Sequence, residues 1–288
     1  MASVVTISNR RAREAAIAFL TPHRRPLPSP ATPQKHFRPF TILTTTQRIT
    51  GVEMGKGPTV LLVHGWEGQI SDFSSLIPAL LKAQYRVVGF DLPAHGGSRE
   101  RIQRRNSDAA NKHLELFFGE AAEQVFQGET ASIPACVAAS LAVQRRFGNF
   151  HAVIGHSVGA LIAAQATTSG LSCRRLVAIA APARYENCAR RFAEHSRLHP
   201  DETEEMIGTL EAMQTQVRTI SLPDIARSQN IPALFIHSRD DRVVPFSDST
   251  ESVGPWRNAR FLQLDGLGHR RILNFPDVVR SVTSFVRA

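Results

Sequence analysis

The sequence lacks long apolar runs, has few cysteines and contains no internal repeats. No run approaches the roughly 20 apolar residues that a helix needs to cross a bilayer, so we expect no stable membrane insertion. The three cysteines, Cys136, Cys173 and Cys188, share no metal-binding spacing and are odd in number. Reduced, buried thiols in a cytoplasmic protein are therefore the better interpretation than a disulfide framework.

The sequence also lacks the features of a nucleic-acid-binding or metal-binding protein. Its formal net charge is +9, but the positive charge is almost all arginine and is scattered along the chain in pairs. Without a nucleic-acid motif or a basic stripe interleaved with aromatic residues, a solvated basic surface is expected, with no nucleic-acid partner. No H-x-H or H-x-x-x-H pair stands at one predicted strand end, so no metal site is expected.

Length and composition favour a soluble protein with one large domain. The chain has 288 residues, of which 42% are hydrophobic and 20% charged, enough to bury a full core. Residues 1–36 form an Arg-rich segment with a Pro-rich linker, and residues 37–288 form the domain. The apolar run at 15–20 loosely imitates a signal peptide, but it is short and no small-residue cleavage site follows. We therefore interpret this segment as a short amphipathic helix that docks on the domain.

Strand patterns alternate with helical ones along the domain. Alternation over residues 40–54 predicts one or two antiparallel edge strands. Continuous apolar runs predict buried strands further on, at 59–63, 85–91, 152–154, 175–180, 231–237 and 260–264. Helical patterns separate these runs, and Ser132 and Pro134 mark the start of one helix that Gly148 ends. The alternation predicts an α/β fold with a mainly parallel sheet and helices on both faces. Residues 99–129 are polar and charged and are interpreted as an insertion, whereas residues 182–230 show helical patterns only.

The strongest local signal is Gly155-His-Ser-Val-Gly159, which fits G-x-S-x-G between an apolar strand and a small-residue helix. The chain must reverse there within very few residues, which strains Ser157 and exposes its hydroxyl. Gly155 and Gly159 let neighbouring backbone approach without collision. Because the helix that follows directs its first amides at this point, Ser157 is a candidate nucleophile.

A serine nucleophile needs a base, and the base needs an acid to orient it. Such residues must follow strands, because the loops at the carboxyl ends of parallel strands converge. The order Ser157, Asp241, His269 matches one known arrangement of the triad. We assign His269 as general base and Asp241 as its orienting acid; Asp240 is the close alternative, more plausibly capping the turn or pairing with an arginine.

The loop His64-Gly65-Trp66 follows an earlier strand and can supply half of an oxyanion site. Gly65 lets the loop bend toward the serine, so that the backbone N–H groups of Trp66 and Val158 form a donor pair. The Trp66 indole is expected to wall the acyl pocket. The other polar residues near the site are expected to be structural: His64, Asp91, His95 and His156. Recognition of an anionic substrate by Arg184, Arg190 and Arg191 ranks below a solvated face.

Five motifs in order resemble those of the α/β-hydrolase superfamily: His64–Gly68, Asp91–Gly96, Gly155–Gly159, Asp241–Pro245 and Gly266–His269. The resemblance implies an eight-stranded, mainly parallel sheet, no cofactor, and a helical cap where residues 182–230 lie. Residues 1–36 and the insertion 99–129 depart from the pattern. Within the superfamily the chain most resembles esterase-like bacterial serine hydrolases. Serine at position 157 argues against the aspartate-nucleophile branches, such as epoxide hydrolases and haloalkane dehalogenases.

These observations predict a carboxylesterase-like serine hydrolase (EC 3.1.1) that cleaves a small or medium carboxylic ester or thioester through an acyl-enzyme. The same triad could serve amide, C–C or perhydrolase chemistry, since specificity depends on pocket shape. A catalytically silent hydrolase fold that binds a ligand or a protein is the alternative from another class. The physiological substrate and the oligomeric state are left open by the sequence.

Overall fold

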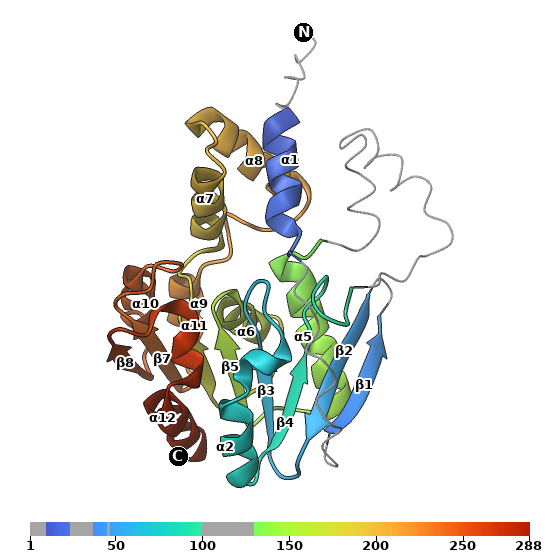
Figure 1. The fold of residues 1–288 in the computed structure, drawn as a ribbon, viewed down its shortest axis with the longest axis vertical. Helices are drawn as coiled ribbons and strands as arrows, with labels where there is room; N and C mark the ends of the chain where they lie inside the picture. The colour runs from blue at the N-terminus through green and yellow to red at the C-terminus, as the bar shows by residue number, and fades with distance from the viewer. Residues whose placement is uncertain (1–9, 24–36, 45–46, 100–129) are drawn as a thin grey trace.

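The computed structural model describes residues 10–23, 37–44, 47–99 and 130–288 (Figure 1). The Pro-rich linker and all but the first residue of the expected insertion at 99–129 lie outside this part of the chain. Within it, no helix combines the length and the apolarity that a membrane span requires.

The centre of the molecule is one eight-stranded sheet with the order β1-β2-β4-β3-β5-β6-β7-β8. Strands β1 and β2 pair antiparallel, as do β2 and β4, and the remaining neighbours are parallel. The predicted eight-stranded, mainly parallel sheet is thus confirmed. The strands are β1 (Phe37–Leu43), β2 (Arg48–Met54), β3 (Thr59–Val63), β4 (Arg86–Phe90), β5 (Ala152–His156), β6 (Leu176–Ile179), β7 (Ala233–Ser238) and β8 (Ala259–Leu264).

Burial explains why the central strands read as continuous apolar runs. Every residue of β3, β5, β6 and β7 is buried, because helices cover both faces of the sheet. Alternate residues of each strand belong to two separate core clusters: Leu61 and Val63 pack on one face, and Val60 and Leu62 on the other.

One face is covered by α5 (Ile133–Phe147) and α6 (Val158–Thr168), and the other by α2 (Leu76–Lys82) and α12 (Pro276–Arg287) (Figure 1). Helix α5 begins where the sequence predicts it: the Ser132 hydroxyl accepts a hydrogen bond from the Ala135 N–H (3.3 Å). Helix α10 (Phe246–Val253) follows β7 and precedes β8. Short turns complete the chain at η1 (Ile70–Phe73), α11 (Gly268–Arg271) and η3 (Ile272–Asn274).

Residues 182–230 contain α7 (Tyr185–His195), α8 (Pro200–Ala212) and α9 (Leu222–Ser228). Helices α7 and α8 stand away from the sheet, beyond the carboxyl ends of its strands, and α1 (Arg10–Leu20) packs beside them (Figure 1). Helix α9 instead packs against α6 and α10. Only the first two of the three helices therefore overhang the sheet.

Candidate active site

Ser157 occupies the turn between β5 and α6 with φ 54° and ψ −131°. A positive φ is strained for a residue with a side chain, and the turn is held by the Ser157 N–H, which donates to the Ile179 carbonyl (2.8 Å). A Cβ on Gly159 would lie 2.3 Å from the His64 carbonyl oxygen, and one on Gly155 would lie 2.4 Å from the Ala160 Cα. Both glycines are therefore required for the close packing of this turn.

Asp241 and His269 meet at the carboxyl ends of β7 and β8. The His269 Nδ1 donates to the Asp241 Oδ2 at 2.7 Å. The other carboxylate oxygen accepts from the N–H groups of Val243 (2.8 Å) and Val244 (2.9 Å). Burial by itself would raise the pKa of Asp241, but hydrogen bonds from His237 and His269 outweigh it and lower the pKa below its usual range. Asp241 is therefore a buried carboxylate that stays ionised.

His237 is a member of this cluster that the sequence did not reveal. Its side chain is fully buried, and its Nε2 lies 3.2 Å from the Asp241 Oδ2 and 3.0 Å from the Val244 carbonyl oxygen. The Ser249 hydroxyl, 2.6 Å from the Nδ1, fixes the other side of the ring. His237 stands within β7 rather than in a loop, and no motif of the sequence marks it.

Asp240 has different partners from Asp241. It accepts hydrogen bonds from the Ser238 hydroxyl and from the Gly268 N–H (3.3 Å), and the Ser238 contact lowers its pKa. Asp240 is exposed and fixes the loop that precedes His269, which corresponds to the turn-capping role rather than to an arginine partner.

Ser157 and His269 line one cavity of about 370 Å³, together with Gly65, Trp66 and His156. The His156 Nε2 lies 2.9 Å from the His269 carbonyl oxygen, and the two rings are 4.8 Å apart between centroids. Burial, and then the neighbouring charge of His269, lowers the pKa of His156 to about 3. A neutral His156 thus fixes the backbone that carries His269, a role more specific than packing beneath the serine.

The loop after β3 lies against the serine. A Cβ on Gly65 would stand 2.9 Å from the Ser157 Cβ. The Val158 N–H belongs to the first residue of α6 and has no intrahelical acceptor. Among the described residues no group accepts from the Trp66 N–H either. The Val158 N–H thus directly follows Ser157, and the Trp66 N–H belongs to the loop whose Gly65 lies against the Ser157 side chain.

Two buried histidines hold that loop from below. The His64 Nδ1 lies 2.8 Å from the Gly65 carbonyl oxygen, and its Nε2 accepts from the Leu92 N–H at 3.0 Å. The His95 Nε2 accepts from the Glu67 N–H at 3.1 Å. Burial, and then the charge of His64, lowers the pKa of His95 to about 3, so it stays neutral. Both rings bind backbone, which is the structural role predicted for them.

Asp91 also has a structural role, since its carboxylate accepts from the Gly97 N–H at 2.9 Å. The cap arginines are already engaged as well. Arg184 contacts Ser221 and Glu251, and Arg190 contacts Glu186 and Glu204. Arg184 and Arg190 are therefore part of surface networks rather than free cations.

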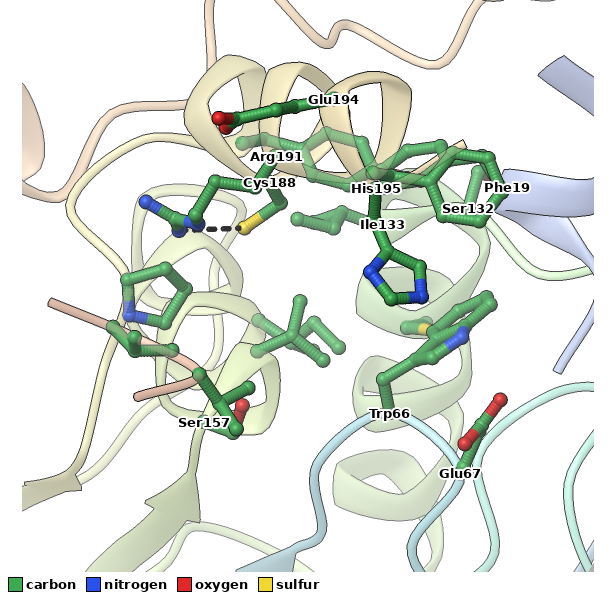
Figure 2. Close-up of a pocket in the computed structure, with 18 of the residues that line it drawn as sticks. Phe19, Trp66, Glu67, Ser132, Ile133, Ser157, Cys188, Arg191, Glu194 and His195 are labelled. Carbon is green, nitrogen blue, oxygen red and sulfur yellow. Dashed lines mark hydrogen bonds between the residues drawn. The ribbon is translucent and has the colours of Figure 1, made fainter. Parts of the chain in front are cut away.

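Ser157 also lines a second, larger cavity of about 790 Å³ (Figure 2). Aromatic side chains form much of its wall: Phe19, Trp66, Tyr185 and Phe192. Cys188 lines it too, but burial raises the pKa of its thiol to about 11, so this sulfur stays protonated. Arg191 also lines it and lies 3.4 Å from Asp248.

Within the described ranges, no group of three or more His, Cys, Asp or Glu side chains is arranged to hold a metal ion. The cysteines are unpaired. The site thus consists of a serine, an imidazole–carboxylate pair and backbone amides.

Comparison with known proteins identifies the family. Residues 58–220 match the family model described as "alpha/beta hydrolase fold", so the chain belongs to the α/β-hydrolase family. The same fold occurs in a proline iminopeptidase-related protein from Thermus thermophilus (TM-score 0.62, 15% identity, covering 87% of this chain and 97% of that one). It also occurs in a thermophilic esterase from Thermogutta terrifontis (TM-score 0.60, 17% identity, 87% and 98% covered). The thioesterase domain from the curacin biosynthetic pathway is similar too (TM-score 0.57, 15% identity, 87% and 99% covered).

Among curated proteins, a short stretch resembles bifunctional epoxide hydrolase 2 of Rattus norvegicus and of Mus musculus. The identity is 34% over 73 residues in both. The match covers 25% of this chain and 13% of the length of each relative. Together with the fold, these similarities support a hydrolase.

Proposed function

We propose that the protein is a serine hydrolase that cleaves a carboxylic ester or thioester through an acyl-enzyme. The observation that carries the proposal is the 2.7 Å contact between His269 and the buried Asp241, in a site where Ser157 stands on a strained turn and shares a cavity with His269. A serine, an imidazole and a carboxylate in this relation are the parts that acyl transfer needs.

In the first half of the reaction the Ser157 Oγ attacks the carbonyl carbon while the His269 Nε2 takes the hydroxyl proton. Asp241 accepts from the Nδ1–H, which leaves the Nε2 as the basic nitrogen and stabilises the imidazolium. The carbonyl oxygen becomes an oxyanion between the amides of Trp66 and Val158. One such donor contributes about 3–4 kcal/mol to transition-state stabilisation.

The tetrahedral intermediate then collapses to the acyl-enzyme. The His269 Nε2 returns its proton to the leaving alkoxide or thiolate as the bond to the acyl carbon breaks. In the second half a water molecule attacks the acyl carbon, His269 takes the proton of that water, and the carboxylic acid leaves as Ser157 regains its hydrogen. The same amides donate hydrogen bonds to the oxyanion in both halves.

The local match to epoxide hydrolases does not favour epoxide opening. That chemistry belongs to branches of the superfamily that the resemblance associates with an aspartate nucleophile, whereas here the strained turn carries Ser157. An epoxide has no carbonyl oxygen for the amide pair to stabilise. Amide, C–C and perhydrolase reactions would use the same residues, and assays on different substrate classes separate them.

The test is a series of p-nitrophenyl esters and acyl thioesters assayed with the wild type and with Ser157→Ala. We expect hydrolysis by the wild type and a loss of at least about 10⁴-fold in kcat on substitution, because the residues of a triad act as a unit. Retained activity in Ser157→Ala would overturn the proposal. Absence of wild-type activity on every ester, thioester and amide would favour a silent fold that binds a ligand.

A further inference from the structure

Two cavities of different character meet at Ser157. The larger, of about 790 Å³, has a largely apolar wall that includes Ile133, Val158 and Ile162. The smaller, of about 370 Å³, has several polar side chains among its lining residues, such as Asp72, His269 and Arg270. Four residues line both cavities and mark the boundary between them: Trp66, Glu67, Ser157 and Val243.

The position of His269, the proposed general base, indicates which cavity holds the leaving group and which holds the acyl group. His269 is one of the lining residues of the smaller cavity and does not line the larger one. Because the imidazole must hand a proton to the leaving atom, the leaving alcohol or thiol lies on the His269 side. The acyl group, bonded to Ser157, then extends into the larger, apolar cavity.

Phe19 of α1 forms part of the wall of the larger cavity. Figure 2 shows Phe19 and Ser157 on opposite sides of the cavity. The Phe19 ring packs against both Tyr185 and Phe192 of α7, with centroid separations of 5.5 and 5.4 Å. Helix α1 precedes the residues 58–220 that match the family model, so this part of the wall comes from a segment outside that match.

Hydrogen bonds fix helix α1 to the rest of the protein at both of its ends. At its start the Arg11 guanidinium donates to Glu202 (3.1 Å) and to the Arg197 carbonyl oxygen (2.8 Å). At its end the Leu20 carbonyl accepts from the Ala131 N–H at 2.7 Å, next to the start of α5.

The chain just after α1 reaches the loop of the proposed oxyanion site. The imidazole of His23 contacts the carboxylate of Glu67, and the His23 N–H donates to the same carboxylate at 3.2 Å. Glu67 lines both cavities and directly follows Trp66, whose amide is a proposed donor. The segment that carries Phe19 is thus joined to the cap, to α5 and to the active-site loop.

We propose that Phe19 closes the acyl cavity and determines the longest straight acyl chain that the enzyme accepts. The proposal rests on the proposed function, and it names the substrate class as esters or thioesters of apolar acyl chains. Removing the ring extends the cavity away from Ser157, and a larger ring shortens it. Each methylene that gains an apolar environment then raises kcat/KM about four-fold.

The experiment compares Phe19→Ala, Phe19→Trp and the matched control Phe147→Ala on p-nitrophenyl esters with acyl chains from two to sixteen carbons. Phe147 is a half-buried phenylalanine that packs against Phe40 at 4.8 Å and is not among the lining residues of either cavity. We expect the optimum to move at least two methylenes longer in Phe19→Ala and to shorter chains in Phe19→Trp, with no change in Phe147→Ala. Identical chain-length profiles for the wild type and both Phe19 variants would overturn the proposal.

A measurement of ligand binding without turnover tests the role of Phe19 independently of the proposed hydrolase activity. In the Ser157→Ala background, isothermal titration with sodium hexanoate, decanoate and hexadecanoate measures the cavity without turnover. We expect Phe19→Ala to increase the affinity for hexadecanoate relative to hexanoate at least ten-fold, and Phe147→Ala to leave the ratio unchanged. A wild type that hydrolyses no ester but shows this shift would refute the hydrolase and retain the wall. A wild type that hydrolyses esters, with a hexadecanoate-to-hexanoate affinity ratio that Phe19→Ala does not change, would retain the hydrolase and refute the role of Phe19. If Phe19→Ala does not fold, the Phe19→Trp profile decides: an optimum that stays in place refutes the wall.

Discussion

Replacing Asp241 with asparagine probes the proposed mechanism because it changes charge and hydrogen bonding while keeping the shape of the side chain. One oxygen of Asp241 accepts from the amides of Val243 and Val244, and the other accepts from His269 and His237. The asparagine oxygen will remain with the two backbone amides, which places its NH₂ group against the imidazole of His269. An N–H cannot donate to an N–H, so the Nδ1 of His269 must become the acceptor.

That change of tautomer puts the ring proton on the Nε2 of His269, where the Ser157 proton has to arrive. The same substitution in a serine triad lowers kcat about 10⁴-fold, equivalent to about 5.4 kcal/mol of transition-state stabilisation. We expect a loss of this size for Asp241→Asn, measured as kcat for p-nitrophenyl butyrate on protein whose thermal melt and circular dichroism spectrum show an intact fold.

The neighbouring carboxylate supplies the control. Asp240 contacts Ser238 and Gly268 rather than the imidazole, so Asp240→Asn is expected to change kcat by less than about ten-fold, the effect of a small shift in position. A larger loss for Asp240→Asn than for Asp241→Asn would refute the assignment. Equal losses would show that the loop as a whole, and not the tautomer, is what the substitution disturbs.

Two further substitutions test the turn and the buried imidazole. Gly159→Ala would place a Cβ 2.3 Å from the His64 carbonyl oxygen, so we expect the free energy of unfolding, measured in urea, to fall by several kcal/mol. The control Gly208→Ala lies on a helix with open space around it and should raise that free energy by about 0.5–1 kcal/mol. Similar effects at both sites would contradict the close packing around Gly159. Burial lowers the pKa of His156 to about 3. Between about pH 6.5 and pH 3 the unfolded chain therefore binds a proton at this imidazole that the folded protein does not bind. The stability that is present above about pH 6.5 is lost as the pH falls through this range. His156→Gln should therefore reduce the pH dependence of the unfolding free energy between pH 6 and 4 by about 1.4 kcal/mol per pH unit. Equal slopes in the wild type and His156→Gln would refute this origin.

Much of the fold followed from local sequence patterns. Continuous apolar runs predicted the parallel strands because burial on both faces leaves no polar position in them, and β3 and β5 lie where those runs stand. The helix beginning after Ser132 was predicted from its cap and from Pro134, and it ends before Gly148 as expected. The strained turn at Ser157 followed from the glycine spacing, since only that spacing permits the contacts around it.

Contacts between residues that are distant in the sequence were harder to predict. Nothing in the sequence indicates that His237, within a buried strand, reaches Asp241, because that contact depends on the loop after β7 turning back on the strand. The bond from His156 to the backbone of residue 269 depends on two strand ends meeting across the sheet. Likewise, a docked amphipathic helix could be expected at α1, but the presence of Phe19 in a cavity wall depends on where α7 stands.

The choice between Asp240 and Asp241 could be predicted only in part from the sequence. Adjacent residues in one turn point in different directions, and the sequence favoured Asp241 with Asp240 as the close alternative. The geometry separates them, because the Asp241 carboxylate is buried beside His269 while Asp240 is exposed and bonded to its own loop.

The measurement that bears most directly on the proposed chemistry is covalent labelling of the folded wild type with a fluorophosphonate, read by intact mass and by peptide mapping. A single phosphonyl adduct on Ser157 is expected, absent in Ser157→Ala and formed far more slowly in Asp241→Asn. No adduct on the folded protein, or an adduct on another residue, would contradict the assignment of Ser157 as the nucleophile.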